Sequence, residues 1–204
     1  MGAALMPPTV DESIAARVSA LSNDGLIIEL LQTLNHLSRW LTPVHDMTRL
    51  NTSLYRSEPS VKDVLFGLRD TEGRVYSLMN AIATQTNPDL DRVPAISRTV
   101  QQEMADHRSN ALVAMSEFRR VRESTTALLR ALPDNAWKRG GYSRQERDWT
   151  IRDLAEFLAV NDWARLGEID QMLTRLGVRS SIAEVSRVSL TEIKQPFSAA
   201  IGRE

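Results

Sequence analysis

The amino-acid sequence predicts an all-α protein built as a bundle of four long helices. Four long segments repeat their apolar residues every three or four positions, as one buried face of a helix requires. No strand-like alternation of apolar and polar residues interrupts these segments. Two of them open with the same capping pattern, Ser60-Val-Lys-Asp63 and Thr150-Ile-Arg-Asp153. Helices with one apolar stripe each bury it best against one another, which favours a four-helix bundle.

The composition is that of an ordinary globular protein without a strong charge bias. The 204 residues are enough for one substantial core, and 42% of them are apolar and 25% charged. A net charge of -1 argues against a broad nucleic-acid or anionic-lipid surface. The absence of cysteine excludes disulfides, thiolate metal sites and cysteine nucleophiles. The first residues lack a signal-peptide pattern, and no stretch is apolar enough to span a membrane, so we expect a cytoplasmic protein with no membrane partner.

The helices are expected in a definite order along the chain. Residues 1–24 form an N-terminal extension, in which a capping box at Thr9-Val-Asp-Glu12 starts a short helix to about Ser22. The bundle itself spans residues 25–177. Its four helices are expected from residue 25 to Pro43, from Ser60 to Thr86, from Pro94 without a break to Leu132, and from Thr150 to Gly177. Residues 178–204 form a polar tail that either packs on the bundle or is flexible.

The two halves of the chain resemble each other when one is shifted by about ninety residues without gaps. Pro43 then falls on Pro133, and the capping box at Ser60 falls on the one at Thr150. The match continues inside the helices, where Glu72 falls on Asp162. Equal spacing between a proline stop and a capping box is harder to obtain by chance than matching apolar stripes. The sequence therefore predicts two repeated helical hairpins.

Two phrases of the sequence resemble DinB-like proteins. Leu128-Leu-Arg-Ala-Leu-Pro-Asp-Asn-Ala-Trp137, followed after a polar gap by Trp149-Thr-Ile-Arg-Asp-Leu154, is similar to the C-terminal half of that family. The segment from Ser60 to Glu72 is similar to its N-terminal motif, and the resemblance covers residues 25–176. It implies a four-helix bundle, often a homodimer, in which many relatives hold a divalent metal with three histidines. Some relatives are thiol-dependent transferases or isomerases, and the family name refers to induction by DNA damage rather than to a reaction.

The resemblance also implies where metal ligands would lie, and this chain carries other residues there. The position on the second helix is Gly67, and the positions on the fourth helix are Phe157, then Asn161 and Arg165. Glycine and phenylalanine have no donor atom, asparagine is a weak neutral ligand, and arginine only donates hydrogen bonds. The histidines, at positions 36, 45 and 107, stand elsewhere. We therefore expect no metal and no cofactor.

The preferred interpretation is a metal-free, non-catalytic DinB-like protein, a homodimer that binds a small molecule or a protein partner. The alternative is a metal-dependent thiol transferase or hydrolase with an atypical ligand set, for which the three histidines are the first candidates. The predicted ligand pocket is the former metal cavity, and its candidate residues are Gly67, Phe157, Asn161, Arg165, Asp70 and Glu72.

Three details of this interpretation can be checked in a structure. The Phe157 ring is predicted to fill space opposite Gly67. Arg165 is expected to form an internal ion pair with Asp70 or Glu72; binding of an anion or exposure to solvent are the alternatives. The basic run from Phe118 to Glu123 is interpreted as a solvated face rather than a nucleic-acid site.

Overall fold

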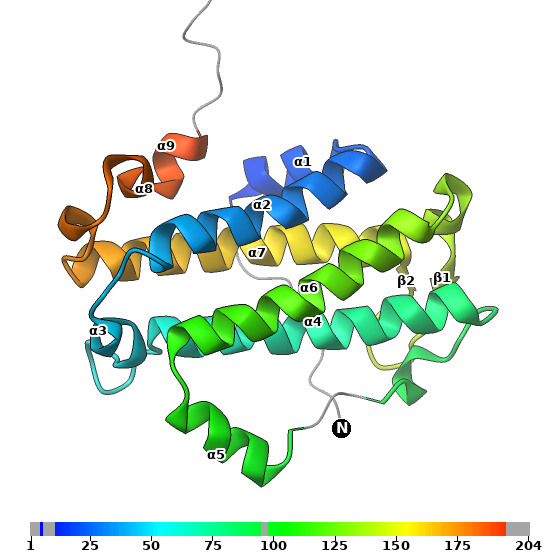
Figure 1. The fold of residues 1–204 in the computed structure, drawn as a ribbon. Coiled ribbons are helices and arrows are strands. Elements are labelled where there is room, and N and C mark those ends of the chain that lie inside the picture. The colour runs from blue at the N-terminus through cyan, green and yellow to red at the C-terminus, as the bar shows by residue number, and fades with distance from the viewer. Residues whose placement is uncertain (1–4, 6–10, 95–97, 195–204) are drawn as a thin grey trace, which may run out of the picture.

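Four long helices form the body of the molecule, as predicted. The computed structural model describes residue 5, residues 11–94 and residues 98–194. The long helices are α2 (Asn23–Leu41), α4 (Val61–Thr84), α6 (Ala111–Ala131) and α7 (Ile151–Arg175) (Figure 1). Helices α2 and α4 each pack against both α6 and α7, so α2 and α4 lie at opposite corners of the bundle. The fold class is therefore confirmed.

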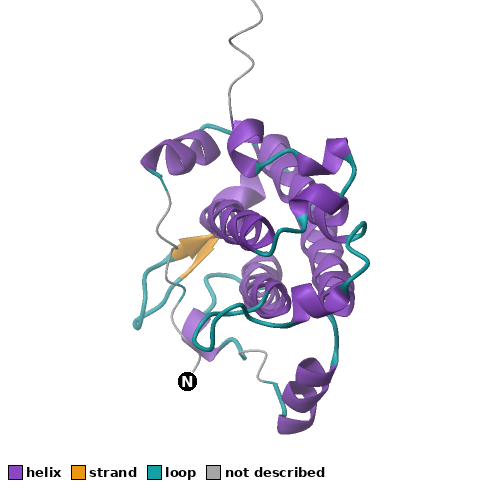
Figure 2. Cartoon of the chain, turned by 90° about the vertical axis from the view of Figure 1, so that its left-hand side faces the viewer, coloured by secondary structure: helices purple, strands orange, loops and turns teal. Residues whose placement is uncertain are grey.

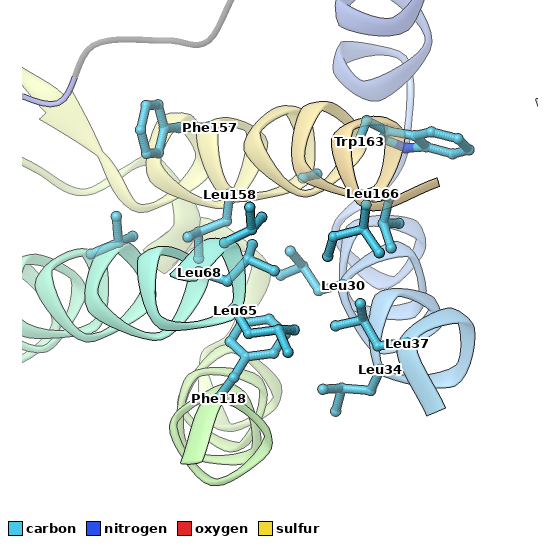
Figure 3. Close-up of a cluster of buried hydrophobic side chains, with 14 of the residues drawn as sticks. Leu30, Leu34, Leu37, Leu65, Leu68, Phe118, Phe157, Leu158, Trp163 and Leu166 are labelled. Atoms are coloured by element: carbon cyan, nitrogen blue, oxygen red, sulfur yellow. The ribbon is translucent and has the colours of Figure 1, made fainter. Parts of the chain in front are cut away.

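The apolar stripes of these helices meet in one core. Leu30, Leu37, Leu65 and Leu158 have no exposed surface, and Phe118 lies among them (Figure 3). Burial of each such side chain contributes about 1.5 to 3 kcal/mol relative to exposure. The predicted capping boxes at Ser60 and Thr150 are both formed, and each starts one of the long helices.

Short elements connect and cover the bundle. They are α1 (Glu12–Ser19), α3 (Met47–Asn51), α5 (Val100–Arg108), α8 (Glu184–Arg187), α9 (Leu190–Lys194) and the 3-10 turns η1 (Leu90–Arg92), η2 (Asp134–Lys138) and η3 (Arg179–Ser181). No strand was predicted between the long helices, but β1 (Gly140–Gly141) and β2 (Trp149–Thr150) pair antiparallel (Figure 2). Gly141 is needed there, because a Cβ would lie 2.8 Å from the Pro88 carbonyl oxygen.

The prediction of one continuous third helix was wrong. The segment contains two helices, α5 and α6, and α5 projects away from the bundle (Figure 1). The chain is extended at Ser109 and Asn110, and the Asn110 side chain accepts a hydrogen bond from the Val113 amide to cap α6. No proline or glycine marks this break. The apolar residues Val100 and Met104 continue the helical spacing of the α6 stripe back into α5, so the sequence shows a single stripe across both helices.

The two ends of the chain beyond the bundle are partly described. Thr9 lies outside the described residues, and α1 is capped by Asp11 and ends at Ser19 rather than Ser22. At the other end, Val178, Ile182 and Leu190 are buried against the bundle. The Leu190 amide also donates to the Asp170 carboxylate at 3.1 Å. Residues 178–194 therefore pack on the bundle, and residues 195–204 lie outside the described residues.

The predicted repeat is visible in the structure, with one correction. Helices α4 and α7 begin 90 residues apart, and so do the left-handed residues that follow them, Asn87 (φ 46°) and Gly177 (φ 66°). The buried faces of α2 and α6 instead match at an offset of 92, which pairs Leu26 with Phe118 and Leu37 with Leu129. The gapless alignment therefore fails by two residues in this pair of helices.

Equivalent cations also hold equivalent helix ends. Lys62 donates to the His107 carbonyl at the end of α5 (3.1 Å), and Arg152, its repeat partner, donates to the Leu21 carbonyl beyond α1 (2.5 Å). Each cation therefore reaches a short helix of the other half. The two halves cross over each other around a pseudo-twofold axis instead of packing as separate hairpins.

Candidate functional site

The positions that the resemblance assigns to metal ligands carry no good donor set. Gly67 on α4 is half-buried, and apart from its chain neighbours and the backbone of its own helix no described atom lies within 4 Å of a Cβ built on it. On α7, Phe157 packs edge-on against Trp149 with ring centroids 5.8 Å apart, and Asn161 is buried. Arg165 is 43% exposed. These positions offer one amide oxygen and no imidazole, thiolate or carboxylate.

The predicted internal ion pair of Arg165 is wrong. Its guanidinium donates to Glu168, one turn further along the surface of α7, at 2.8 Å. Asp70 is half exposed and pairs with Arg69, whereas Glu72 is fully buried. Residues 70 and 72 lie about 200° apart around a helix, so they face opposite directions. The six predicted pocket residues therefore do not line one cavity.

The prediction that Phe157 fills the space opposite Gly67 is also wrong. The Phe157 ring lies on the side of α7 away from Leu65 and Leu68 (Figure 3). Because no described atom approaches the missing Cβ of Gly67, the ring does not occupy that space.

The histidines do not form a cluster either. His36 is half-buried beside Trp40, and its pKa is lowered by burial and by the nearby charge of Arg39. His45 and His107 are exposed on the connection before α3 and on α5. Among the described residues, no three His, Asp or Glu side chains are arranged to hold a metal ion.

The most highly connected polar group in the core was missed by the sequence analysis. Arg122 on α6 is fully buried, although it belongs to the basic run interpreted as a solvated face; Arg119 and Arg120 in that run are exposed. Its Nε and Nη2 donate to Glu72 on α4 at 2.9 and 2.7 Å. Its Nη1 and Nη2 donate to Asp162 on α7 at 2.6 and 2.9 Å.

This core arginine cluster joins all four long helices. Nη1 of Arg122 also donates to the Leu30 carbonyl of α2 at 2.8 Å, so all five N–H donors of the guanidinium are used. Thr33 on α2 donates to Asp162 at 2.7 Å. Because breaking such a buried group is costly, the cluster fixes how the helices fit together.

The cluster holds two carboxylates and one cation, and the pKa values of Glu72 and Arg122 are shifted. Burial raises the pKa of Glu72; the charge of Arg122 opposes this, and that of Asp162 adds to it. Burial alone would lower the pKa of Arg122, but the charges of Asp162 and Glu72 raise it above its usual value. Arg122 therefore remains charged, and Glu72 is held by an arginine that keeps its proton.

A second ionic group fastens α5 to the bundle. Arg69 on α4 is 5% exposed and donates to Asp106 on α5 at 2.9 Å and to Glu117 on α6 at 2.5 Å. Arg98 also donates to Asp106, at 2.6 Å. Helix α5 has no buried residue of its own, so these contacts and the Lys62 hydrogen bond hold it in place.

Comparisons with known proteins address the fold. No protein-family model and no curated protein matches the chain. Among solved structures it is similar to YfiT from Bacillus subtilis, described as a probable metal-dependent hydrolase with an unusual four-helix bundle topology. The identity is 19%, the TM-score is 0.61, and the match covers 78% of this chain and 91% of YfiT.

At this identity the likeness shows the fold. The chain has a four-helix bundle fold like that of YfiT, and the resemblance of its motifs predicted such a bundle. None of the helices that the structure describes is long and apolar enough to cross a lipid bilayer.

Proposed function

We propose that this protein is a DinB-like bundle that acts by binding a ligand or partner, without the three-histidine metal chemistry of the family. One observation supports the proposal: the donor set at the mapped ligand positions. A catalytic zinc site needs about three good protein donors that converge on the ion. Gly67 and Phe157 supply none, Asn161 supplies one weak oxygen, and Arg165 turns to Glu168. These residues do not fit a metal ion.

The contacts of the mapped ligand positions also support a binding role rather than metal chemistry. Phe157 is held against Trp149, next to the start of α7, so the former ligand position has become part of an aromatic contact. The core arginine cluster consumes Glu72 and Asp162, the two carboxylates buried most deeply on α4 and α7. Neither carboxylate has a free role as a general base while Arg122 binds both.

A second candidate function is a metal-dependent hydrolase or thiol transferase with an atypical ligand set. The likeness to YfiT favours it, because YfiT is described as a probable metal-dependent hydrolase. In that case the ligands have to come from positions other than those mapped here. His36, His45 and His107 are the first residues to replace in such a test, although they lie on separate elements.

Metal content distinguishes the two functions. Untagged protein is analysed by mass spectrometry before and after incubation with Zn²⁺, Ni²⁺ and Mn²⁺, followed by dialysis. We expect far less than one ion per chain in every case. A zinc protein of known stoichiometry, carried through the same incubation and dialysis, serves as the positive control. One tightly held ion per wild-type chain would overturn the proposal and favour the hydrolase.

A further inference from the structure

We infer that a pocket at one end of the bundle binds a small zwitterion, such as a free amino acid with an apolar side chain. This inference rests on the proposed binding function and names its site. The α4-end pocket lies between the end of α4 and the start of α7 and measures about 570 Å³, within the usual range of about 300 to 1,000 Å³ for small-molecule sites. It is lined by Thr86, Asn87, Arg139, Gly140, Gly141, Asp148, Trp149 and Thr150.

The repeat provides an equivalent end for comparison, between the end of α7 and the start of α4. The pocket at that end measures about 10 Å³, and its lining includes Glu58, Ser60, Arg175 and Leu176. The two ends share some backbone features but differ in others: Gln85 is extended after α4, whereas the corresponding Arg175 still belongs to α7, and Gly140–Gly141 form a strand where Leu50 and Asn51 belong to α3. The left-handed residues Asn87 and Gly177 correspond, and an arginine binds the last carbonyls of each long helix, Arg139 for α4 and Arg49 for α7. The difference in volume therefore has a backbone part and a side-chain part.

The closed end is filled by groups that the open end lacks. Leu50 is fully buried at the closed end, where the open end has Gly140. Arg175 donates to Glu58 at 3.0 Å across the closed pocket. The residues at the corresponding positions of the open end are Gln85 for Arg175, Thr86 for Leu176 and Asp148 for Glu58, and none of them forms such a bridge among the described residues.

Core packing does not set the size of the side chains at the rim of the α4-end pocket. Gln85, Thr86 and Asp148 are exposed. Gly141 differs, because a Cβ at this position would collide with the Leu90 side chain and the Pro88 carbonyl oxygen. The small polar residues of the rim therefore need a reason other than stability.

The charges of the pocket indicate the kind of ligand. Arg139 is held in place by hydrogen bonds to the carbonyls of Ala83 (2.9 Å) and Gln85 (2.8 Å). Asp148 accepts one hydrogen bond, from the Ser143 amide at 3.2 Å. Within the described part of the chain neither side chain forms an ion pair, so the pocket presents one available cation and one available anion.

A free amino acid matches this arrangement. Its carboxylate would accept hydrogen bonds from Arg139, and its ammonium would donate to Asp148. The exposed surface of the lining is more apolar than polar, which suits an apolar side chain; the Trp149 ring itself is buried under the Arg147 guanidinium. Asn87 and Thr86 offer neutral hydrogen bonds at the rim, where Gly177 and Leu176 offer none at the closed end.

The test uses L-phenylalanine as the probe. Its binding to the full chain is monitored by nitrogen-15 NMR. The amides of Gly140 and Gly141 and the indole N–H of Trp149 report on the pocket. We expect these signals to shift at millimolar probe. Phenethylamine lacks the carboxylate and 3-phenylpropionate lacks the ammonium, so each should bind at least tenfold more weakly. Unchanged signals with L-phenylalanine and L-leucine, or equal binding of both analogues, would overturn the inference.

Two variants locate the site. Gln85→Arg with Thr86→Leu and Asp148→Glu copies the closed end into the open one and should weaken binding at least tenfold. The matched control, Arg175→Gln with Leu176→Thr, alters the closed end and should bind as the wild type does. Binding that survives the first variant would contradict the assignment. A stoichiometric metal in the wild type would overturn the proposed function without moving these pocket signals, so the two failures are distinguishable.

Discussion

Replacement of Arg122 by methionine tests the view that the core arginine cluster holds the four helices together. The change removes five hydrogen bonds and leaves Glu72 and Asp162 buried without a cation. Removing one partner of a buried ionic group costs about 3 to 5 kcal/mol. A domain of this kind has a total unfolding free energy of about 5 to 15 kcal/mol, so the loss is a large part of it.

The loss of unfolding free energy should depend on pH. The direction of this dependence follows from the buried carboxylates that are left without a cation. Without Arg122, Glu72 carries a folded-state pKa above that of the unfolded chain, because burial and the charge of Asp162 oppose its ionisation. A group of this kind stabilises the fold below its unfolded pKa, and the contribution is lost as the pH rises through the folded pKa. The slope is up to about 1.4 kcal/mol per pH unit. The variant should therefore lose most at pH 8 and least near pH 5.

Urea unfolding followed by circular dichroism at pH 5 and pH 8 measures both quantities. Arg120→Met is the matched control, since Arg120 is exposed on the same helix, and it should change stability by less than about 0.5 kcal/mol. Replacing the whole cluster with apolar residues, Arg122→Met with Glu72→Met and Asp162→Leu, should recover most of the loss. If Arg122→Met costs no more than Arg120→Met, or if its cost is the same at both pH values, the account of the cluster is refuted.

Four further predictions follow from the structure. Burial raises the pKa of Glu72 in the folded state above its ordinary value of 4.5, so part of the free energy of unfolding declines as the pH rises above 4.5. Glu72→Gln should remove this pH-dependent part, and urea titrations across pH 4 to 8 measure its slope. Arg69→Met should speed amide exchange in α5 at least tenfold while leaving α6 unchanged, as hydrogen exchange would show. Gly141→Ala should cost about 1 to 3 kcal/mol, whereas Gly67→Ala, in open space inside a helix, should gain about 0.5 to 1 kcal/mol in thermal unfolding. Light scattering should give a dimer of the 22.9 kDa chain, as the family resemblance implies, and a monomer at micromolar concentration would contradict it.

The parts of the fold that depend on local chemistry could be predicted from the sequence. Each capping box, at Ser60 and at Thr150, uses residues within one helical turn of each other. Its pattern can therefore be recognised without knowing the partner helices. The break between α5 and α6 was missed because Ser109 and Asn110 are weak stop signals beside an apolar pattern that continues past them. The weak signal was Asn110 itself, which is a good N-cap residue.

The core arginine cluster could have been found from the stripe on α6. Phe118, Arg122, Thr125 and Leu129 follow one another at helical spacing, so Arg122 stands on the apolar face and not on the solvated one. Glu72 and Asp162 stand on the stripes of α4 and α7 in the same way. Three charged residues at core positions, with opposite signs, indicate an internal ion pair. The α4-end pocket leaves no such signal, because its volume depends on side chains from three separate segments.

The pseudo-twofold arrangement separates differences that the fold requires from differences that it does not. In the core, Asp162 accepts a hydrogen bond from Thr33, and the equivalent Glu72 lies beside the equivalent Thr125. One guanidinium supplies enough donors for both carboxylates. Leu30, which corresponds to Arg122 in the repeat, can therefore be apolar. Charge and space explain this difference between the two halves. The divergence between the two end pockets is of another kind, because its side chains at positions 85, 86 and 148 are exposed and core packing does not select them. The proposed ligand site therefore lies where the fold leaves the choice of side chain open.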